Sequence, residues 1–346
     1  MIDLHSPNLE PLRSVTSSIF NPQRPAYTLR QEITEITKIL SKSGIIWIDS
    51  QEDISHGETK TSNGLALSPT MAAMCADDFV RTIQFLRGTH AAIVDNRKQF
   101  PDRPTRVLYV GCGPYATLAV PLMVMFTPKE VTFTLLDVHP ESIESVKSIV
   151  NILGLIDYVT HFETMDAGSY HIDPGWPPDI ILMEIMQACL ISEPQVAITR
   201  HLLPQAPKAI LIPEEVRIDL MLVDLSREFE LDNLERKVGV IQRDRIPVAS
   251  VFVVNRETVN SWKNNCTRRL PGSTVQIPHS LEQRYQAMLF TIIHVYKNHI
   301  LKDYDSGLTC PRILSIERAI KAGDTIQFYY ELGQQPRLIG EVGSGS

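Results

Sequence analysis

The fold is decided by the stretch Arg106-Val107-Leu108-Tyr109-Val110-Gly111-Cys112-Gly113, a short apolar run that ends at a pair of glycines. An apolar run of this length next to glycine predicts a buried strand. A helical pattern over 116–125 follows, and then a second strand over 131–137, which ends in the carboxylate of Asp137. A strand, a glycine turn, a helix and a second strand ending in an acid are typical of one nucleoside-binding half of a Rossmann-like sheet.

Strands and helices alternate on both sides of this unit. Further helices are predicted over 28–42, 68–95, 141–153 and 193–203, and further strands over 158–164, 179–183 and 208–212. This alternation predicts an α/β fold with a parallel, doubly wound sheet. Residues 1–26 are rich in proline, and we predict no regular element there.

The pattern changes after Pro213. Strand-like segments are predicted over 216–223, 239–242, 248–254, 287–295 and 325–330, with turn residues such as Pro271-Gly272 between them. Only weak helix signals separate these segments, which predicts a β-rich domain. We therefore predict three parts: an N-terminal helical segment 1–67, a Rossmann-like domain 68–213 and a β-rich, barrel-like domain 214–340.

Composition narrows the classes of function. The 346 residues are 43% apolar and 21% charged, an ordinary globular balance. The net charge of −7 argues against a broad basic surface for nucleic acid. Five scattered cysteines without a C-x-x-C pair predict neither a metal site nor a disulfide framework. No signal-peptide pattern and no membrane-spanning run is present, so we expect a cytoplasmic protein that binds no membrane.

The glycine turn narrows the choice of cofactor. Gly111 and Gly113 let the backbone approach a ligand closely, because neither carries a Cβ atom. Asp137 is placed to accept hydrogen bonds from two ribose hydroxyls, and Asp166, after the third strand, from an adenine amino group. A dinucleotide site needs a third glycine, but Tyr115 stands near that position, and no phosphate-binding Gly-Lys-Ser/Thr is present. S-adenosylmethionine, which has no pyrophosphate, suits this turn better.

Two glutamates follow the strand predicted over 179–183. Glu184 comes directly after it, and Glu193 comes nine residues later, before Pro194. Two carboxylates supply four oxygens, which can hold the five N–H donors of a guanidinium group. Among 40 acidic residues the spacing alone is weak evidence, and an acid at the start of a helix is also favoured by the helix dipole. The position of the pair after a strand is stronger evidence than its spacing, because a nucleotide-binding sheet presents its ligand groups at the ends of its strands.

These segments resemble those of the class I S-adenosylmethionine-dependent methyltransferases, and more specifically of the arginine methyltransferases. The resemblance rests on residues 107–113, on Asp137, on the separation of Glu184 and Glu193, and on Phe79-Val80-Arg81-Thr82. It covers residues 70–215 well and is fainter beyond. It implies a cofactor site made of Arg81, Gly111, Cys112, Gly113, Asp137, Val138, Asp166 and Ala167. It also implies that Glu184 and Glu193 are catalytic and bind the substrate together with Met186.

The sequence departs from the family at three places. Tyr109 stands where the family has an acid before the glycine turn, and Tyr115 stands at the third glycine. Thr309-Cys310-Pro311 stands where the family has a Thr-His-Trp loop in its barrel. That loop helps to form the wall of the substrate pocket, so its change puts the usual peptide substrate in doubt.

The resemblance and its departures together predict transfer of a methyl group to a guanidino nitrogen. The expected substrate is free L-arginine or another small guanidino compound, with peptide arginine as the alternative. Transfer of the aminobutyryl group of the same cofactor, as in nicotianamine synthesis, is a second alternative. A scaffold whose pocket is blocked by Tyr109 and Tyr115 is a third. The family usually forms homodimers through an arm in the barrel domain, and the polar stretch 225–246 is compatible with a reduced arm and equally with a loop.

Overall fold

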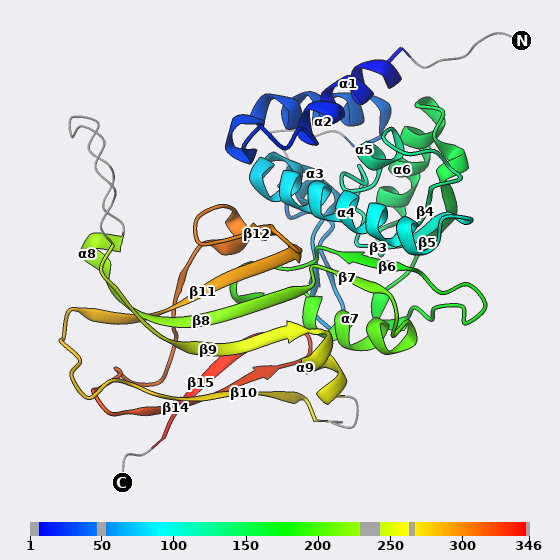
Figure 1. Cartoon of the computed structure of the whole chain (residues 1–346). Coiled ribbons are helices and arrows are strands. Elements are labelled where there is room, and N and C mark those ends of the chain that lie inside the picture. The colour runs from blue at the N-terminus through cyan, green and yellow to red at the C-terminus, as the bar shows by residue number, and fades with distance from the viewer. Residues whose placement is uncertain (1–6, 47–52, 229–242, 263–266, 344–346) are drawn as a thin grey trace, which may run out of the picture.

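The computed structural model describes residues 7–46, 53–228, 243–262 and 267–343, and Figure 1 shows the chain. One sheet of five parallel strands lies beside a second, β-rich part. The parallel strands, in the spatial order β5-β4-β3-β6-β7, are β5 (Val159–Thr164), β4 (Val131–Asp137), β3 (Thr105–Val110), β6 (Ile180–Met183) and β7 (Ile210–Ile212). β6 is buried at every residue, as expected for a parallel strand that is covered on both faces.

Helices cover both faces of this sheet. They are α4 (Phe79–Gln99), α5 (Val120–Met123), α6 (Pro140–Ile152) and α7 (Gln195–Leu202). α4 contacts β3, β6 and β7, and α6 contacts β4 and β5. α7 lies on the opposite side of the sheet in Figure 1. The long helix α4 also contacts two strands of the second part, β11 and β12, so it connects both parts of the molecule.

The N-terminal elements form a second layer and a short hairpin. They are α1 (Leu9–Ile19), α2 (Arg30–Ser43), β1 (Thr59–Lys60), β2 (Leu65–Ala66) and α3 (Pro69–Met74). α1 packs on α5, and α2 packs on α4 and α6, so both helices lie outside the first helical layer. Their apolar stripes are buried there, including Leu12 and Ile19 of α1 and Ile33, Ile36 and Leu40 of α2.

The C-terminal part consists of two antiparallel sheets. One has the order β12-β11-β8-β9 with β13 on β11, and the other has the order β10-β14-β15. The strands are β8 (Glu215–Asp224), β9 (Arg245–Asn255), β10 (Arg269–Gln276), β11 (Tyr285–Tyr296), β12 (His299–Leu301), β13 (Arg312–Ile313), β14 (Thr325–Glu331) and β15 (Arg337–Val342). Two short helices accompany them, α8 (Leu225–Glu228) and α9 (Arg256–Ser261). Phe252 of β9 stacks on Tyr330 of β14 at 5.0 Å between ring centres, which joins the two sheets into a barrel-like body.

Most predicted elements are confirmed within a few residues, and four differ. Residues 9–19 form a helix, although no regular element was predicted there. The helix tolerates Pro11 because this residue lies in its first turn, where no backbone donor is lost. The helix predicted over 68–95 is interrupted between α3 and α4 at 75–78. Of 116–125 only 120–123 is α-helical, since Ala116 has a φ of +42°.

Pro271 and Gly272 are the fourth difference. They lie inside β10, at an irregularity in its pairing with β14, and do not form a turn between strands. A Cβ atom at Gly272 would lie 2.8 Å from the Val251 oxygen, so glycine allows β9, β10 and β14 to approach closely. The strand predicted over 239–242 and residues 229–242 of the predicted arm lie outside the described residues. The domain boundaries stay predictions; β7 ends at Ile212 and β8 begins at Glu215.

Candidate active site

A cavity of about 350 Å³ lies at the carboxyl ends of β3, β4 and β6. This is within the range of small-molecule sites, and the carboxyl edge of a doubly wound sheet is where such sites form. All the site residues predicted from the sequence line it: Arg81, Gly111, Cys112, Gly113, Asp137, Val138, Asp166, Ala167, Glu184, Met186 and Glu193. The parallel strands bring together residues that are more than 100 positions apart in the chain.

The glycine turn and Asp137 form one hydrogen-bonded unit. The Gly111 and Cys112 N–H groups donate to the Leu136 oxygen, and the Gly113 N–H donates to Asp137 Oδ2 at 2.8 Å. The His139 N–H donates to Asp137 Oδ1 at 2.9 Å. A carboxylate has about four acceptor positions, so Asp137 keeps capacity for a ligand, mainly on Oδ2, because Oδ1 also faces His139 Nδ1 at 3.4 Å.

Gly111 is required for a second reason that the sequence did not indicate. Its φ is +66°, and a Cβ atom there would lie 2.3 Å from the side chain of Ile185. A side chain at this position would therefore collide with the residue that directly follows Glu184. The glycine turn thus allows the segment after β6 to pass close to the end of β3.

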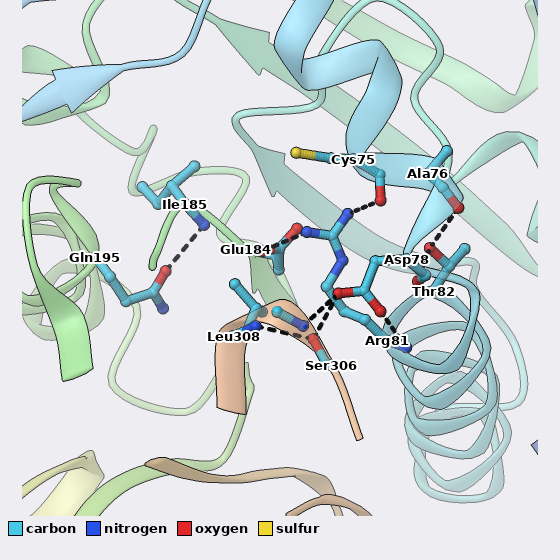
Figure 2. Close-up of polar contacts among 11 residues, drawn as sticks. Cys75, Ala76, Asp78, Arg81, Thr82, Glu184, Ile185, Gln195, Ser306 and Leu308 are labelled. Atoms are coloured by element: carbon cyan, nitrogen blue, oxygen red, sulfur yellow. Dashed lines mark hydrogen bonds and ion pairs between the residues drawn. The ribbon is translucent and has the colours of Figure 1, made fainter. Parts of the chain in front are cut away.

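Arg81 and Glu184 are in contact, although the sequence indicated separate roles for them. Arg81 Nη1 donates to Glu184 Oε1 at 3.3 Å, and Nη2 donates to the Cys75 oxygen (Figure 2). These two bonds leave three of the five guanidinium donors available. Arg81 can therefore hold Glu184 and still bind a second carboxylate.

Both glutamates are buried, which changes their acidity. The Glu184 side chain is 13% exposed, and Glu193 as a residue is 6% exposed. Burial raises the pKa of Glu184 to about 7, although Arg81 acts in the opposite direction. Burial raises the pKa of Glu193 to about 8, and the charge of Glu184 adds to this increase. A cation that enters the cavity favours the ionised form of both groups.

The loop between the two glutamates has a strained backbone. Cys189, Leu190 and Ser192 have φ values of +61°, +56° and +65°, in the left-handed region that residues with a side chain rarely adopt. Each such residue costs about 1–3 kcal/mol and persists only where its surroundings enforce it. The loop therefore has to be held in place from outside.

The barrel-like part supplies these contacts. The Cys189 N–H donates to Thr291 Oγ1 at 2.8 Å, and the Tyr330 hydroxyl donates to the Leu190 oxygen at 2.6 Å. The Ser192 N–H donates to the Pro336 oxygen at 2.9 Å. The separation of the two glutamates thus depends on strands β11 and β14 and on the turn before β15.

A second contact between the two parts lies at the start of α4. Asp78 precedes this helix, and its carboxylate accepts bonds from the Ser306 hydroxyl at 2.7 Å and the Gly307 N–H at 2.9 Å (Figure 2). Asp78 Oδ1 also accepts the Arg81 N–H at 3.5 Å. The barrel loop that departs from the family pattern is therefore still attached to the helix that carries Arg81. The Cys310 thiol donates to the Ser306 oxygen at 3.6 Å, and the Cys310 N–H donates to the Gly307 oxygen at 3.5 Å.

Sequence reasoning missed the hairpin formed by β1 and β2. Thr61, Leu65 and Ala66 of this hairpin line the cavity. Thr59 Oγ1 contacts His139 Nε2 at 3.1 Å, and the Leu65 N–H donates to the Ser192 oxygen at 2.8 Å. The hairpin thus connects the His139 side of the cavity with the end of the glutamate loop. The Asn63-Gly64 pair is a common hairpin turn and was the available signal.

Gly64 is expected to be sensitive to substitution. It has a φ of +147°, and a Cβ atom there would lie 2.7 Å from the Ser192 oxygen. We expect Gly64→Ala to lower the free energy of unfolding by roughly 3 kcal/mol in urea titrations. Gly154→Ala is the matched control, since Gly154 has a φ of +69° with no atom near its Cβ position. We expect it to cost only about 1 kcal/mol; equal losses would show that the hairpin does not press on the glutamate loop.

Other residues that line the cavity were not predicted from the sequence. These are Thr61, Leu65, Ala66, Leu67, Met71, Cys75, Thr117, His139, Gln187 and Arg312, among others. Tyr109 lines the cavity, whereas Tyr115 does not, and its hydroxyl donates to the Ile46 oxygen at 3.0 Å. Tyr115 therefore leaves the cavity open.

Comparison with known proteins places this geometry in a fold class. One solved structure with a similar fold is a chain of the Trypanosoma brucei PRMT1 enzyme–prozyme heterotetrameric complex with AdoHcy. The two chains share a TM-score of 0.51 and 15% sequence identity, over 79% of this chain and 92% of that chain. Neither protein-family models nor curated proteins give a match. The predicted fold is confirmed.

The described residues contain no group of three or more His, Cys, Asp or Glu side chains that could hold a metal ion. No helix in the described ranges has the length and apolar character needed to cross a bilayer.

Proposed function

We propose that this protein is an S-adenosylmethionine-dependent N-methyltransferase that acts on the guanidino nitrogen of a small molecule, with L-arginine as the first candidate. The observation that carries the proposal is the meeting of Glu184, Glu193 and Arg81 in one buried cavity with Asp137 and the glycine turn. The similar fold of a chain solved in a complex with AdoHcy supports the same class of cofactor.

The residues on the strand ends fit this cofactor. Beside the two N–H groups that it already holds, Asp137 has acceptor capacity left for ribose hydroxyls. Asp166 Oδ1 accepts the Gly168 N–H at 2.8 Å, and its second oxygen can accept from an adenine amino group. Arg81 has donors left for the amino-acid carboxylate. When bound, S-adenosylmethionine supplies an electrophilic methyl group on a positively charged sulfur.

The two glutamates prepare the acceptor. A free guanidinium is a poor nucleophile, because it is protonated and its charge is delocalised. Glu184 and Glu193 can draw that charge toward the nitrogens they contact and fix the orientation of the reacting nitrogen. A carboxyl group with a pKa near neutrality can also hold the proton that leaves the guanidinium.

The hairpin limits the size of the substrate. The β1–β2 hairpin lies against Ser192 and His139, so it covers the cavity from the N-terminal side. An arginine inside a peptide needs an open groove for the chain on both sides of it. Because the hairpin closes one side of the cavity, less room is left for a chain on both sides of the arginine, which favours a small guanidino compound over a peptide.

The alternatives have weaker support. Transfer of the aminobutyryl group would not need two carboxylates to hold a guanidinium, and its by-product is methylthioadenosine. A scaffold blocked by Tyr109 and Tyr115 is disfavoured, because Tyr115 lies outside the cavity and the cavity is open although Tyr109 lines it. A homodimer and a cytoplasmic location stay predictions.

One incubation separates these functions. The protein is mixed with cofactor carrying a labelled methyl group and with either free L-arginine or an Arg/Gly-rich peptide. We expect methylarginine and S-adenosylhomocysteine with free L-arginine, and no label in the peptide. Label in the peptide alone would refute the small substrate. Methylthioadenosine in place of S-adenosylhomocysteine would refute methyl transfer.

A further inference from the structure

The cavity contains two cationic side chains, and only one of them is paired. The cationic, acidic and histidine residues that line it are Arg81, Asp137, His139, Asp166, Glu184, Glu193 and Arg312. Arg81 is buried and bound to Glu184. Arg312 is exposed, and its side chain makes no ion pair within the described part of the chain. A residue that both lines the cavity and is exposed lies where the cavity meets solvent.

Arg312 lies beside the loop that carries the glutamates. It opens β13 and pairs with Leu289 of β11. The Cys189 thiol contacts the Leu289 oxygen at 3.7 Å, and Cys189 lies midway between Glu184 and Glu193. Burial raises the pKa of the Cys189 thiol to about 11, although Thr291 and Arg312 both act in the opposite direction. Arg312 is therefore near enough to this loop to act on it electrostatically.

Apart from Arg81, Asp137 and Asp166, which are assigned to the cofactor, the charges of the cavity form two groups. A buried negative pair can hold a guanidinium, and an exposed guanidinium stands beside the loop of that pair. A molecule complementary to both has a cation at one end and an anion at the other. Carboxylate is the anion that a guanidinium binds best in bidentate geometry.

We propose that Arg312 binds the carboxylate of a free guanidino acid whose guanidinium lies between Glu184 and Glu193. This inference rests on the proposed function and adds a selection rule to it. The site accepts small molecules that carry both groups and discriminates against guanidino compounds that lack the carboxylate. Arg312 acts as a substrate-binding residue and takes no part in the chemical step.

Three acceptors test this rule: L-arginine, L-argininamide and agmatine, which is arginine without its carboxylate. We expect wild-type kcat/KM to be at least about 10-fold higher for L-arginine than for the other two. Arg312→Ala should lower the value for L-arginine by about 10-fold and leave that for agmatine nearly unchanged. Arg312→Glu should reverse the preference in favour of agmatine. Lys321→Ala removes an exposed cation outside the cavity and should change neither value.

The outcomes separate this inference from the proposed function. If wild-type protein methylates all three acceptors equally, or if Arg312→Ala lowers all three alike, the carboxylate contact is refuted while guanidino methylation stands. Higher activity on a peptide with an acidic residue beside its arginine would assign Arg312 to a peptide partner and refute the free acid. If the protein binds cofactor but methylates none of these acceptors, the proposed function itself fails. The wild-type comparison decides even if the variants do not fold.

Discussion

Glu193→Gln and Glu184→Gln are each expected to lower kcat/KM for the guanidino substrate by about 10³-fold or more. Each variant removes one buried charge that the guanidinium requires, and losing one partner of such a pair costs about 2–5 kcal/mol. Cofactor binding should remain within a few-fold for Glu193→Gln. Turnover with labelled methyl donor and calorimetry with S-adenosylhomocysteine measure the two properties separately.

Glu193→Gln and Glu184→Gln should also differ in their free energy of unfolding. The folded-state pKa of Glu193 is raised to about 8, so between about pH 4.5 and 8 the folded protein holds a proton that the unfolded chain releases. Stability therefore falls as the pH rises through this window. Glu193→Gln does not titrate, and we expect it to exceed the wild type by roughly 1–4 kcal/mol at pH 8, with a smaller difference at pH 5. Glu184→Gln leaves Arg81 without its carboxylate and should not be more stable.

Glu144→Gln serves as the control for both measurements. Glu144 is exposed on α6, and its pair with Lys147 joins residues three positions apart on the helix surface. Its substitution should change activity and stability very little. If Glu193→Gln or Glu184→Gln kept more than about a tenth of wild-type turnover, the pair would not be the guanidinium site.

Asp137→Asn is expected to weaken binding of S-adenosylhomocysteine by about 10²-fold or more. Asp137 accepts the N–H groups of Gly113 and His139 on its two oxygens and keeps acceptor capacity for a ligand. Asparagine has one oxygen, so its amide group would turn a donor toward one of these N–H groups. Each lost bond to a charged acceptor costs about 1.5–3 kcal/mol.

Calorimetry measures this effect, with Asp157→Asn as an exposed control in the same domain. A second, independent measurement uses the wild-type protein and a cofactor analogue that lacks both ribose hydroxyls. It should bind about as weakly as the natural compound binds to Asp137→Asn. Unchanged affinity in both arms would mean that the cofactor does not contact Asp137.

The sequence predicted the α/β sheet well because its signals are local. The run from Arg106 to Gly113 and the strand ending at Asp137 each carry their own pattern. Parallel strands place their carboxyl ends at the same edge of the sheet. The residues that follow each strand therefore lie close together. The prediction failed where a local signal was ambiguous. Pro11 can begin a helix as well as prevent one, and Pro271-Gly272 can lie in a strand as well as in a turn.

The contacts between side chains could not be predicted in the same way. Arg81 and Glu184 are 103 positions apart, and Asp78 and Ser306 are 228 apart. Neither pair leaves a periodic pattern in the chain. The hairpin over the cavity was missed because its strands are only two residues long, too short to show alternation.

The left-handed residues of the glutamate loop have a consequence for how this protein can change over evolution. The loop belongs to the α/β part by its place in the chain, yet Thr291, Tyr330 and Pro336 of the barrel-like part hold it. Two of these contacts span 102 and 140 positions. Exchange of the barrel for a foreign one would shift the two carboxylates without altering either of them. A substitution in the barrel-like part that moves this loop would therefore change the substrate site without touching either glutamate.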